Sequence, residues 1–235
     1  MDGHGTARRI GKNEKKDIAI GVKMEKIVLV GAGGHAKSVV DTIENGNKYE
    51  IIGFVSNEEI GKKVYKDYSC IAHDDDLGIV FASGITNAFI SIGYMGKGQI
   101  RNKLYELLCN IGFQFPPIID ISAVIGNSAI IGEGAFIGKR AIVNANAVID
   151  RMAIINSGVI VEHDSHVGEF SHVAVGAVCA GNTQIGCNTL IGANATIIQG
   201  VGVGSNCIVG AGAVVLKNVE DNTTVYGVPA RESER

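Results

Sequence analysis

The chain has 235 residues, of which 46% are hydrophobic and 19% are charged, and it contains 32 glycines. Its net charge of −3 excludes the basic surface that nucleic-acid binding needs. No apolar run reaches the length of a membrane-spanning helix, and no apolar secretory signal is found at the N-terminus, so we expect a cytoplasmic protein without membrane contact. The five cysteines form no CxxC pair, which also indicates a reducing compartment.

The first half of the chain divides into a polar leader and a small folded unit. Residues 1–23 are charged and lack periodicity, so we expect a disordered leader or tag. Residues 24–117 are interpreted as one α/β domain of Rossmann-like layout, with the stiff pair Pro116-Pro117 near its end. The expected strands are 26–30, 49–55 and 88–92, and the expected helices are 36–44 and 99–111.

A glycine-rich turn, Gly31-Ala-Gly-Gly-His-Ala36, lies between the first expected strand and the first expected helix. Glycines there let the backbone approach a phosphate, and the helix N-terminus supplies free N–H donors. A dinucleotide, a nucleotide-sugar diphosphate and a merely structural turn all remain open. The dinucleotide interpretation requires an acid after the second strand, where the chain has Ser56-Asn57. His35 either donates to a phosphate or caps the helix at the surface.

From Ile121 to Leu216 the sequence repeats every six residues. An aliphatic residue recurs at the same place in each unit, and a small or compact residue stands two positions before it. Neither a helix nor a plain strand gives this period, whereas one flat side of a parallel β-helix does. Three sides would make a coil of about eighteen residues, with coils stacked ~4.8 Å apart. The inward aliphatic positions are Ile125, Ile131, Ile137, Val143, Ile149, Ile155, Val161, Val167, Val173, Cys179, Ile185, Ile191, Ile197, Val203, Val209 and Val215.

We therefore expect a β-helical prism over residues 118–216 and a tail over 217–235 that leaves the coil and packs back on it. Flat apolar sides of such a prism would remain exposed in a single copy. A symmetric homotrimer would bury them, and we expect one.

Three of the six histidines, His163, His166 and His172, lie within ten residues and alternate with carboxylates. Their spacing does not match the three-histidine zinc sites of other prisms, and no cysteine joins them, so we expect no metal. His163 is the best candidate for a general base, because flanking acids such as Asp164 would orient one ring nitrogen and raise its basicity. A solvated surface histidine is the alternative.

The eighteen-residue coil brings further residues into line with these. Gly181 would lie one coil along from His163, where its N–H could bind the carbonyl oxygen of an acyl group. Ala193 and Ala211 would lie one coil apart and form a smooth groove for a long, thin arm. No serine or cysteine nucleophile is expected beside His163, which favours direct transfer over a covalent intermediate.

The segment VEHDSHVGEFSHVAVGAVCAGN, together with GAGGH and GVPA, resembles the bacterial left-handed β-helix sugar acetyltransferases of the PglD and NeuD group. The resemblance covers residues 25–231 and implies a mixed fold, a small α/β domain followed by a left-handed prism. It implies that acetyl-CoA acetylates a nucleotide-activated amino sugar, UDP-4-amino-4,6-dideoxyhexose, with His163 as the base and Asp164 as its partner.

The same resemblance implies two binding sets. His172, Gly181, Ala193 and Ala211 would contact acetyl-CoA, and we add Asn156; Gly33, Gly34 and His35 would contact the nucleotide sugar, and we add Gly93. Members that bind UDP-sugars carry an Asp pair where this chain has Ser56-Asn57. The alternatives are O-acetylation of sialic acid or a related sugar, and a non-enzymatic trimeric sugar-binding scaffold.

Overall fold

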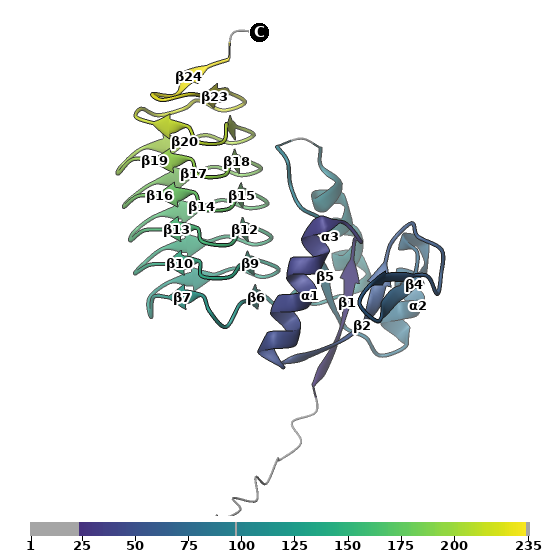
Figure 1. Cartoon of the computed structure of the whole chain (residues 1–235). Helices are drawn as coiled ribbons and strands as arrows, with labels where there is room; N and C mark the ends of the chain where they lie inside the picture. Colours follow the sequence, from purple (N-terminus) through teal and green to yellow (C-terminus); the bar gives the residue numbers. More distant parts are fainter. Residues whose placement is uncertain (1–23, 97, 234–235) are drawn as a thin grey trace, which may run out of the picture.

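The computed structural model describes residues 24–96 and 98–233. These residues form an α/β part and a tall prism of short strands, which lie side by side (Figure 1). The expected leader, residues 1–23, lies outside the described residues.

The α/β part is built on a five-stranded sheet in the order β3-β4-β2-β1-β5. β1 pairs in parallel with β2 and β5, β2 pairs in parallel with β4, and β3 runs antiparallel to β4. The strands are β1 Glu25–Val30, β2 Tyr49–Val55, β3 Lys63–Tyr65, β4 Tyr68–Ala72 and β5 Asn87–Ile90. The helices are α1 Gly34–Gly46, the short 3-10 turn Asp74–Asp76, α2 Leu77–Ala82 and α3 Ile100–Ile111.

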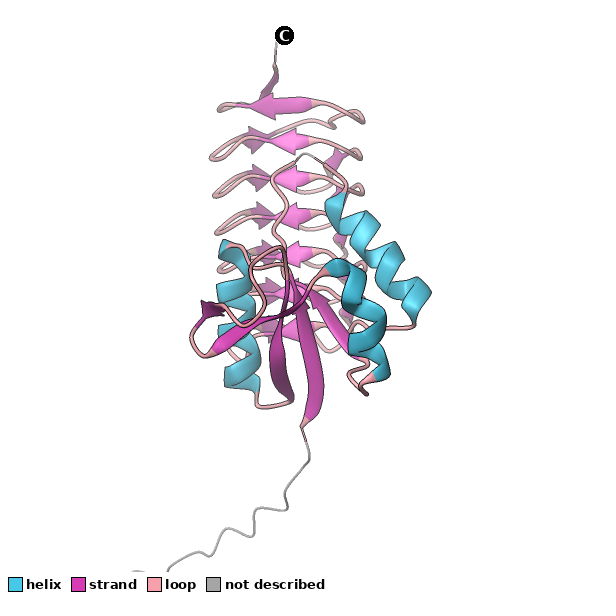
Figure 2. Ribbon diagram, turned by 90° about the vertical axis from the view of Figure 1, so that its right-hand side faces the viewer, coloured by secondary structure: helices cyan, strands magenta, loops and turns pink. Residues whose placement is uncertain are grey.

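Helices cover both faces of this sheet, with α1 on one side and α2 and α3 on the other (Figure 2). The last four residues of β1 are accordingly all buried, and the strand reads as a continuous apolar run instead of an alternation. The three predicted strands and two predicted helices are present. The edge hairpin β3–β4 and helix α2 were not predicted, because the hairpin is half-exposed and charged and α2 is only six residues long.

The prism begins at β6 and winds upward through two-residue strands. Its strands are β6 Ile118–Ile119, β7 Val124–Ile125, β8 Ile130–Ile131, β9 Phe136–Ile137, β10 Ile142–Val143, β11 Val148–Ile149, β12 Ile154–Ile155, β13 Ile160–Val161, β14 His166–Val167, β15 His172–Val173, β16 Val178–Cys179, β17 Gln184–Ile185, β18 Leu190–Ile191, β19 Thr196–Ile197, β20 Gly202–Val203, β21 Ile208–Val209, β22 Val214–Val215, β23 Thr224–Tyr226 and β24 Arg231–Glu232.

The strands stack into three sheets. We call β6-β9-β12-β15-β18-β21-β23-β24 the domain-side sheet, because the α/β part packs on it; β7-β10-β13-β16-β19-β22 is the second sheet and β8-β11-β14-β17-β20 the third. Partners such as Ile142 and Ile160 are eighteen residues apart in parallel register, as the six-residue repeat predicts. The chain thus folds as an α/β domain followed by a left-handed β-helix.

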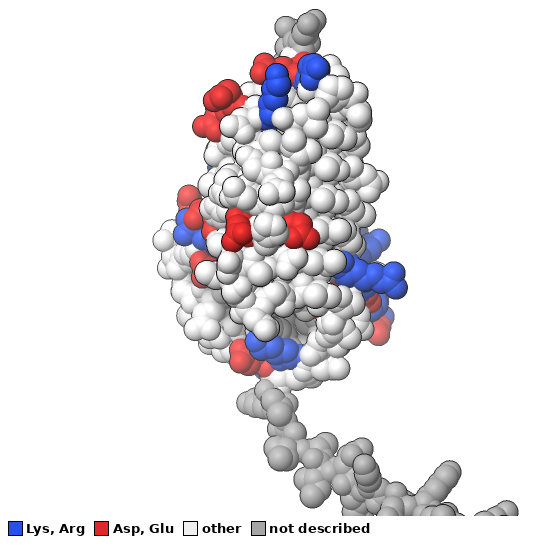
Figure 3. All heavy atoms as spheres, turned by 90° about the vertical axis from the view of Figure 1, so that its left-hand side faces the viewer, with Lys and Arg blue, Asp and Glu red and all other residues white. Residues whose placement is uncertain are grey.

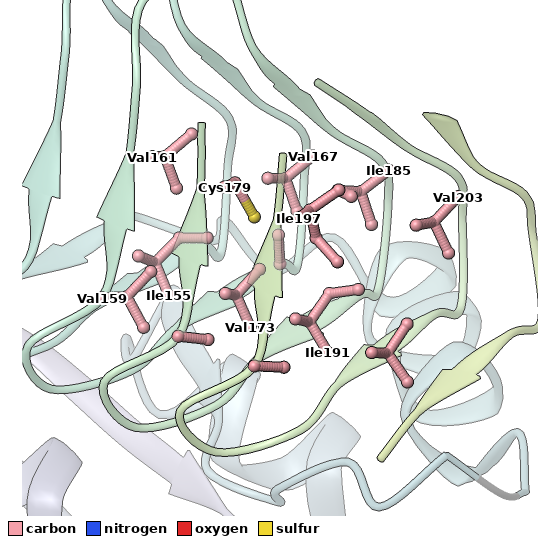
Figure 4. Packing of buried hydrophobic residues seen from close by; sticks show 14 of the residues in the cluster. Ile155, Val159, Val161, Val167, Val173, Cys179, Ile185, Ile191, Ile197 and Val203 are labelled. Atoms are coloured by element: carbon pink, nitrogen blue, oxygen red, sulfur yellow. The ribbon is translucent and has the colours of Figure 1, made fainter. Parts of the chain in front are cut away.

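The prism interior is filled by the predicted aliphatic column, which points inward from all three sheets (Figure 4). Every predicted large inward residue is the second residue of its strand, from Ile125 in β7 to Val215 in β22. The small residues two positions earlier complete the packing at the corners, and Ala141, Ala147 and Ala153 are fully buried there. Dense stacking of apolar side chains holds the prism together.

The tail differs in detail from the prediction. Residues 224–226 form β23, which pairs in parallel with β21 and so adds another rung to the domain-side sheet. Only then does the chain turn back, as β24 runs antiparallel to β23. The tail therefore caps the prism by continuing it first.

The α/β part is fixed to the first coils of the prism by a buried polar contact. Thr42 on α1 donates to Asp120, which follows β6, at 3.0 Å. Lys139 contacts both Asp120 and Asp41 of α1. Phe136 and Ile154, which point outward from the domain-side sheet, join the apolar cluster under α1. The two parts share one continuous buried contact.

Candidate active site

The histidine proposed as base lies at the corner between the second and third sheets, in the turn between β13 and β14. Half of the His163 side chain is exposed (52%), and its Nδ1 lies 2.8 Å from Oδ2 of Asp164. Asp164 occupies the left-handed region of the backbone (φ 58°), which aspartate tolerates at such a turn. The turn therefore aims the carboxylate at the neighbouring imidazole.

The coil below holds both flanking acids in place. Asn146 donates from Nδ2 to Oδ1 of Asp164 at 3.1 Å, and Asn144 donates to Oε2 of Glu162 at 3.0 Å. Glu162 in turn accepts from the backbone N–H of His163. The sequence analysis did not assign a role to either asparagine, although each lies eighteen residues before the acid it holds.

Electrostatics at this corner favour an imidazole that accepts protons readily. The hydrogen bond that His163 donates to Asp164 is the main cause that raises the pKa of His163, and the same bond lowers the pKa of Asp164. In the neutral imidazole, Nδ1 carries the proton toward Asp164, which leaves the lone pair of Nε2 free. The free nitrogen can act as a general base.

Gly181 lies one coil above His163, on the same corner, as the eighteen-residue spacing predicts. A methyl group built on Gly181 would lie 2.7 Å from Nε2 of the imidazole. Among the described residues, no acceptor is found for the backbone N–H of Gly181. The corner therefore presents a proton acceptor and an unpaired donor in adjacent coils, which is what attack on an acyl group requires.

His172 occupies a different place from His163. It faces outward from the domain-side sheet, but the α/β part covers it, and only 7% of the residue is exposed. Its Nδ1 lies 2.7 Å from the carbonyl oxygen of Tyr94, and its Nε2 lies 3.2 Å from Nδ2 of Asn156. The structure thus brings Asn156 and His172 together and separates them from His163 within one chain.

His35 lies close to this pair. Its ring contacts Phe136 edge-on at 4.8 Å, and its buried Nε2 has no hydrogen-bond partner in residues 24–96 and 98–233. Burial, with the nearby His172 and Arg101, lowers the pKa of His35 to about 3. His35 is therefore neutral at physiological pH, and it is not the surface helix cap that the sequence analysis had left open.

The glycine-rich turn borders a cavity of about 450 Å³ at the carboxyl ends of β1, β2 and β5. Gly31 needs its glycine, because it has φ +105° and a methyl group there would lie 2.3 Å from Ile92. Gly33 and Gly34 have open space where a side chain would be. Gly93 borders His35, since a methyl group on it would lie 3.6 Å from the His35 Cβ.

Polar groups for a ligand also line this cavity. Ser56 and Asn57 follow β2, and the acids Glu58 and Asp74 lie on the same wall. Open backbone at a helix N-terminus on one side and hydrogen-bonding side chains on the other suit a nucleoside diphosphate. Glu58 and Asp74 were not predicted as site residues; Asp74 follows β4, a strand that was also not predicted.

Ala193 and Ala211 form the predicted column, one coil apart, at the corner between the domain-side and second sheets. They do not lie beside His163. The whole width of the second sheet separates this corner from the one that carries His163 and Gly181. Within one chain, the Ala193–Ala211 column and the base therefore lie at different corners of the prism.

The three clustered histidines do not converge. His163 is at a corner, His166 points outward from the third sheet toward Asp150, and His172 lies under the α/β part. The described part of the chain contains no group of three or more His, Cys, Asp or Glu side chains placed to hold a metal ion.

Family models match both parts of the chain. The family model described as the PglD N-terminal domain matches residues 26–108. The model described as bacterial transferase hexapeptide (six repeats) matches residues 182–217. Among curated proteins, none matches the chain.

Solved structures resemble both parts at once. The acetyltransferase domain of PglB from Neisseria gonorrhoeae is 31% identical, with a TM-score of 0.82, and the match covers 89% of this chain and all of that one (100%). The chain belongs to the PglD group of left-handed β-helix sugar acetyltransferases. The same Neisseria domain has also been solved in complex with acetyl coenzyme A.

Two further solved structures extend the comparison. A histidine-to-asparagine variant of perosamine N-acetyltransferase from Caulobacter crescentus, in complex with CoA and GDP-perosamine, is 29% identical with a TM-score of 0.84. That match covers 89% of this chain and 97% of the other. WeeI from Acinetobacter baumannii is 26% identical with a TM-score of 0.76, over 89% of this chain and 100% of its own. In each of these proteins, one chain matches both the α/β part and the prism of this acetyltransferase.

Proposed function

We propose that this acetyltransferase moves the acetyl group of acetyl-CoA onto the amino group of a nucleotide-activated 4-amino sugar. The observation that carries the proposal is the imidazole of His163, with Nδ1 held by Asp164 and Nε2 directed at Gly181. The Caulobacter relative supports it, because that protein has been solved with CoA and an amino-sugar nucleotide.

The chemistry requires one proton acceptor and one oxygen-binding donor. The amine nitrogen of the sugar attacks the thioester carbon, so a C–N bond forms as the C–S bond breaks. Nε2 of His163 takes the proton that the nitrogen loses and returns it to the departing sulfur. The N–H of Gly181 stabilises the charge that develops on the carbonyl oxygen.

Each substrate has a candidate place. The cavity beside Gly33 and Gly34 suits the nucleoside diphosphate, and His35 and Gly93 lie on the way from it to the prism. The Ala193–Ala211 column suits the thin arm of acetyl-CoA, because small residues leave the corner free. The nucleobase is open to test: the chain has Ser56-Asn57 where UDP-sugar enzymes of this group have acids.

We further propose that the site is completed between copies of a homotrimer. In one chain the α/β part covers the domain-side sheet, while His163 lies across the prism. The prism surface away from the α/β part carries few charged side chains (Figure 3). The outward positions of the second sheet are uncharged along their full height, namely Val124, Ile142, Ile160, Val178, Thr196 and Val214. A three-fold arrangement would bury this surface and bring His163 of one copy to the sugar of the next.

Two features of the described residues concern the cellular compartment of the enzyme. Among the described residues no helix is both long and apolar enough to cross a bilayer. All five cysteines are free thiols. We propose a cytoplasmic location, because free thiols are typical of a reducing compartment.

The test is a thiol-release assay with acetyl-CoA and paired acceptors, UDP- and GDP-linked 4-amino sugars against free sialic acid. We expect release with a nucleotide-linked amine and a mass gain of one acetyl group. His163→Ala should lower kcat by about 10²–10⁴. His166→Ala is the matched control, because His166 has its own partner, Asp150, on the third sheet. Release with sialic acid alone would indicate an O-acetyltransferase, and no release with any sugar would indicate the scaffold.

A further inference from the structure

Arg101 is a buried cation without a counter-ion. Only 3% of the residue is exposed, and none of the ion pairs in the described residues involves it. Its guanidinium donates instead to two backbone carbonyls of the prism, those of Met152 and Phe170, the latter at 3.2 Å. Burying an unpaired charge is costly, so this contact needs a reason other than simple packing.

The two carbonyls belong to a regular column. Met152 and Phe170 are eighteen residues apart at the corner between the third and domain-side sheets, and Asn188 is the next member. The carbonyl of Asn188 is also bound by the α/β part, because Tyr94 donates its hydroxyl to it at 2.8 Å. Three successive coils therefore offer equivalent carbonyls, and side chains of the α/β part bind all three. We call Met152, Phe170 and Asn188 the carbonyl ladder.

Two residues of the carbonyl ladder have side chains that are unusual for their backbone conformation. Met152 and Phe170 both adopt the left-handed conformation, with φ of 57° and 59°. Most other residues at this turn position are asparagine or glycine, which adopt it more easily. Both bulky side chains are buried against the α/β part, and the Arg101 guanidinium lies 5.8 Å from the Phe170 ring centre. Strained backbone of this kind persists where the surrounding contacts require it.

Arg101 also lies next to the nucleotide cavity. It is the second residue of α3, and its neighbours Ile100 and Leu104 line the cavity wall. The ladder rungs that it binds, residues 152 and 170, bracket the coil that contains His163. A three-fold axis parallel to the prism keeps equivalent coils of neighbouring copies at the same height. The level at which α3 docks therefore sets the level at which a sugar nucleotide meets the base.

We infer that Arg101 is a positioning residue: it locks α3 to the carbonyl ladder and thereby holds the nucleotide-sugar cavity level with the coil that carries His163. This inference rests on the proposed function. A delocalised cation with five N–H donors on a rigid plane suits two carbonyls on adjacent coils. The ammonium of a lysine is a compact point charge and cannot span them in the same way.

The test compares Arg101→Met, Arg101→Lys and the control Lys103→Met, which alters an exposed cation on the same helix. For Arg101→Met we expect kcat for the nucleotide amino sugar to fall about 10²-fold, the loss expected for a displacement near 1 Å. The KM for acetyl-CoA and the affinity for the nucleoside diphosphate alone should stay unchanged. Arg101→Lys should recover part of the loss, and Lys103→Met should match the wild type.

A wild-type kcat in Arg101→Met, or in Arg101→Lys if the methionine variant does not fold, overturns the inference. The inference is also overturned if the affinity for the nucleoside diphosphate falls as much as the activity does, because Arg101 would then contribute to nucleotide binding in the cavity and not to positioning. Hydrogen exchange without substrate separates this result from failure of the proposed function. Arg101→Met should exchange faster at α3 and at residues 152 and 170. Unchanged exchange there would show that Arg101 does not lock α3 to the carbonyl ladder, whatever sugar the enzyme acetylates.

Discussion

Gly181 stands so close to His163 that a single methyl group on it would overlap the imidazole: the added carbon would lie 2.7 Å from Nε2 and 2.8 Å from Cε1. The two residues come from successive coils, and the backbone N–H of Asn182 donates to the carbonyl of His163 at 2.8 Å. The separation between the backbones of the base and the glycine is therefore fixed by the prism, while half of the His163 side chain is exposed to solvent.

Gly181→Ala is expected to push the imidazole out of position. Because His163 is exposed, the ring can move without unfolding the chain, so the melting temperature should stay within a few degrees of the wild type. The kcat should fall by about 10²-fold, the effect of a 1 Å misplacement. Steady-state kinetics and a melting curve on the same sample check both parts. Full activity would mean that Nε2 does not face the reacting carbonyl.

Asp164→Asn should change the pH dependence of the reaction. The hydrogen bond with Asp164 raises the pKa of His163, and the base must be neutral to accept a proton, so activity falls as the pH drops through that raised value. In the variant this fall should move to lower pH, while the rate at high pH drops about 10- to 100-fold because the ring is less well oriented. The profile of kcat/KM against pH measures both. An inflection that stays in place would contradict the role of Asp164.

Asn146→Ala offers a finer test of the same corner. Asn146 touches Asp164 but not the imidazole, so its loss should free the carboxylate and shift the pH inflection in the same direction by a smaller amount. Asn144→Ala is the matched control, since Asn144 binds Glu162 in the same way, two positions before the Asn146–Asp164 contact. Equal shifts in the two variants would show that the coil below acts on the corner as a whole.

Gly33→Leu should block the nucleotide without disturbing the fold. Gly33 has φ −82°, which any residue adopts, and no atom lies within 4 Å of an added Cβ. We expect unchanged stability, a KM for the nucleotide amino sugar raised at least tenfold, and an unchanged KM for acetyl-CoA. Gly78→Leu, at an equally open position on α2, provides the comparison. If Gly33→Leu leaves the sugar-nucleotide KM alone, the cavity beside α1 is not the binding site.

Acid should weaken the contact between the two parts. Burial lowers the pKa of His172, and it lowers the pKa of His35 to about 3, so both are neutral in the fold but take up protons near pH 6.5 when unfolded. Their contribution is complete above pH 6.5 and is lost as the pH falls below it, for His35 down to about pH 3. Each group adds a slope of at most about 1.4 kcal/mol per pH unit to the free energy of unfolding.

Denaturant titrations between pH 8 and pH 4 measure that slope. His35→Gln should reduce this slope by up to about 1.4 kcal/mol per pH unit, the contribution of one proton, because the variant has one buried imidazole fewer. Gly78→Leu, which changes no titratable side chain, is the comparison and should leave the slope unchanged. A His35→Gln slope equal to that of the wild type would mean that His35 can be protonated in place.

The prism could be predicted residue by residue because its rule is local and strict. A one-residue slip would turn Ile149 or Ile191 from the interior to the surface, so the repeat records the register directly. The same arithmetic predicted that Gly181 sits above His163. It could equally have found Asn146 below Asp164, had the spacing been applied downward along the chain.

The contacts between the two parts could not be predicted in this way. His172 looks like an outward residue in the repeat, and it is buried because the α/β part, including Tyr94, packs over it. Ala193 follows the repeat as well as Gly181 does, but the sequence gives no sign of how neighbouring copies place the two corners together. Arg101 had one available signal, since it shares a helix face with Leu104 and Leu108 and so breaks an apolar stripe.

The carbonyl ladder has a consequence for how such a protein can change in length. Coils added beyond Asn188 would lengthen the corner that carries the Ala193–Ala211 column by ~4.8 Å each and leave the docking of α3 unchanged. A coil duplicated between Met152 and Asn188 would instead separate the partners of Arg101 and Tyr94 by one step. Growth by repeat duplication is thus tolerated at the top of the column and blocked at its middle, which makes chimaeras with taller prisms practical only when they are spliced above β18.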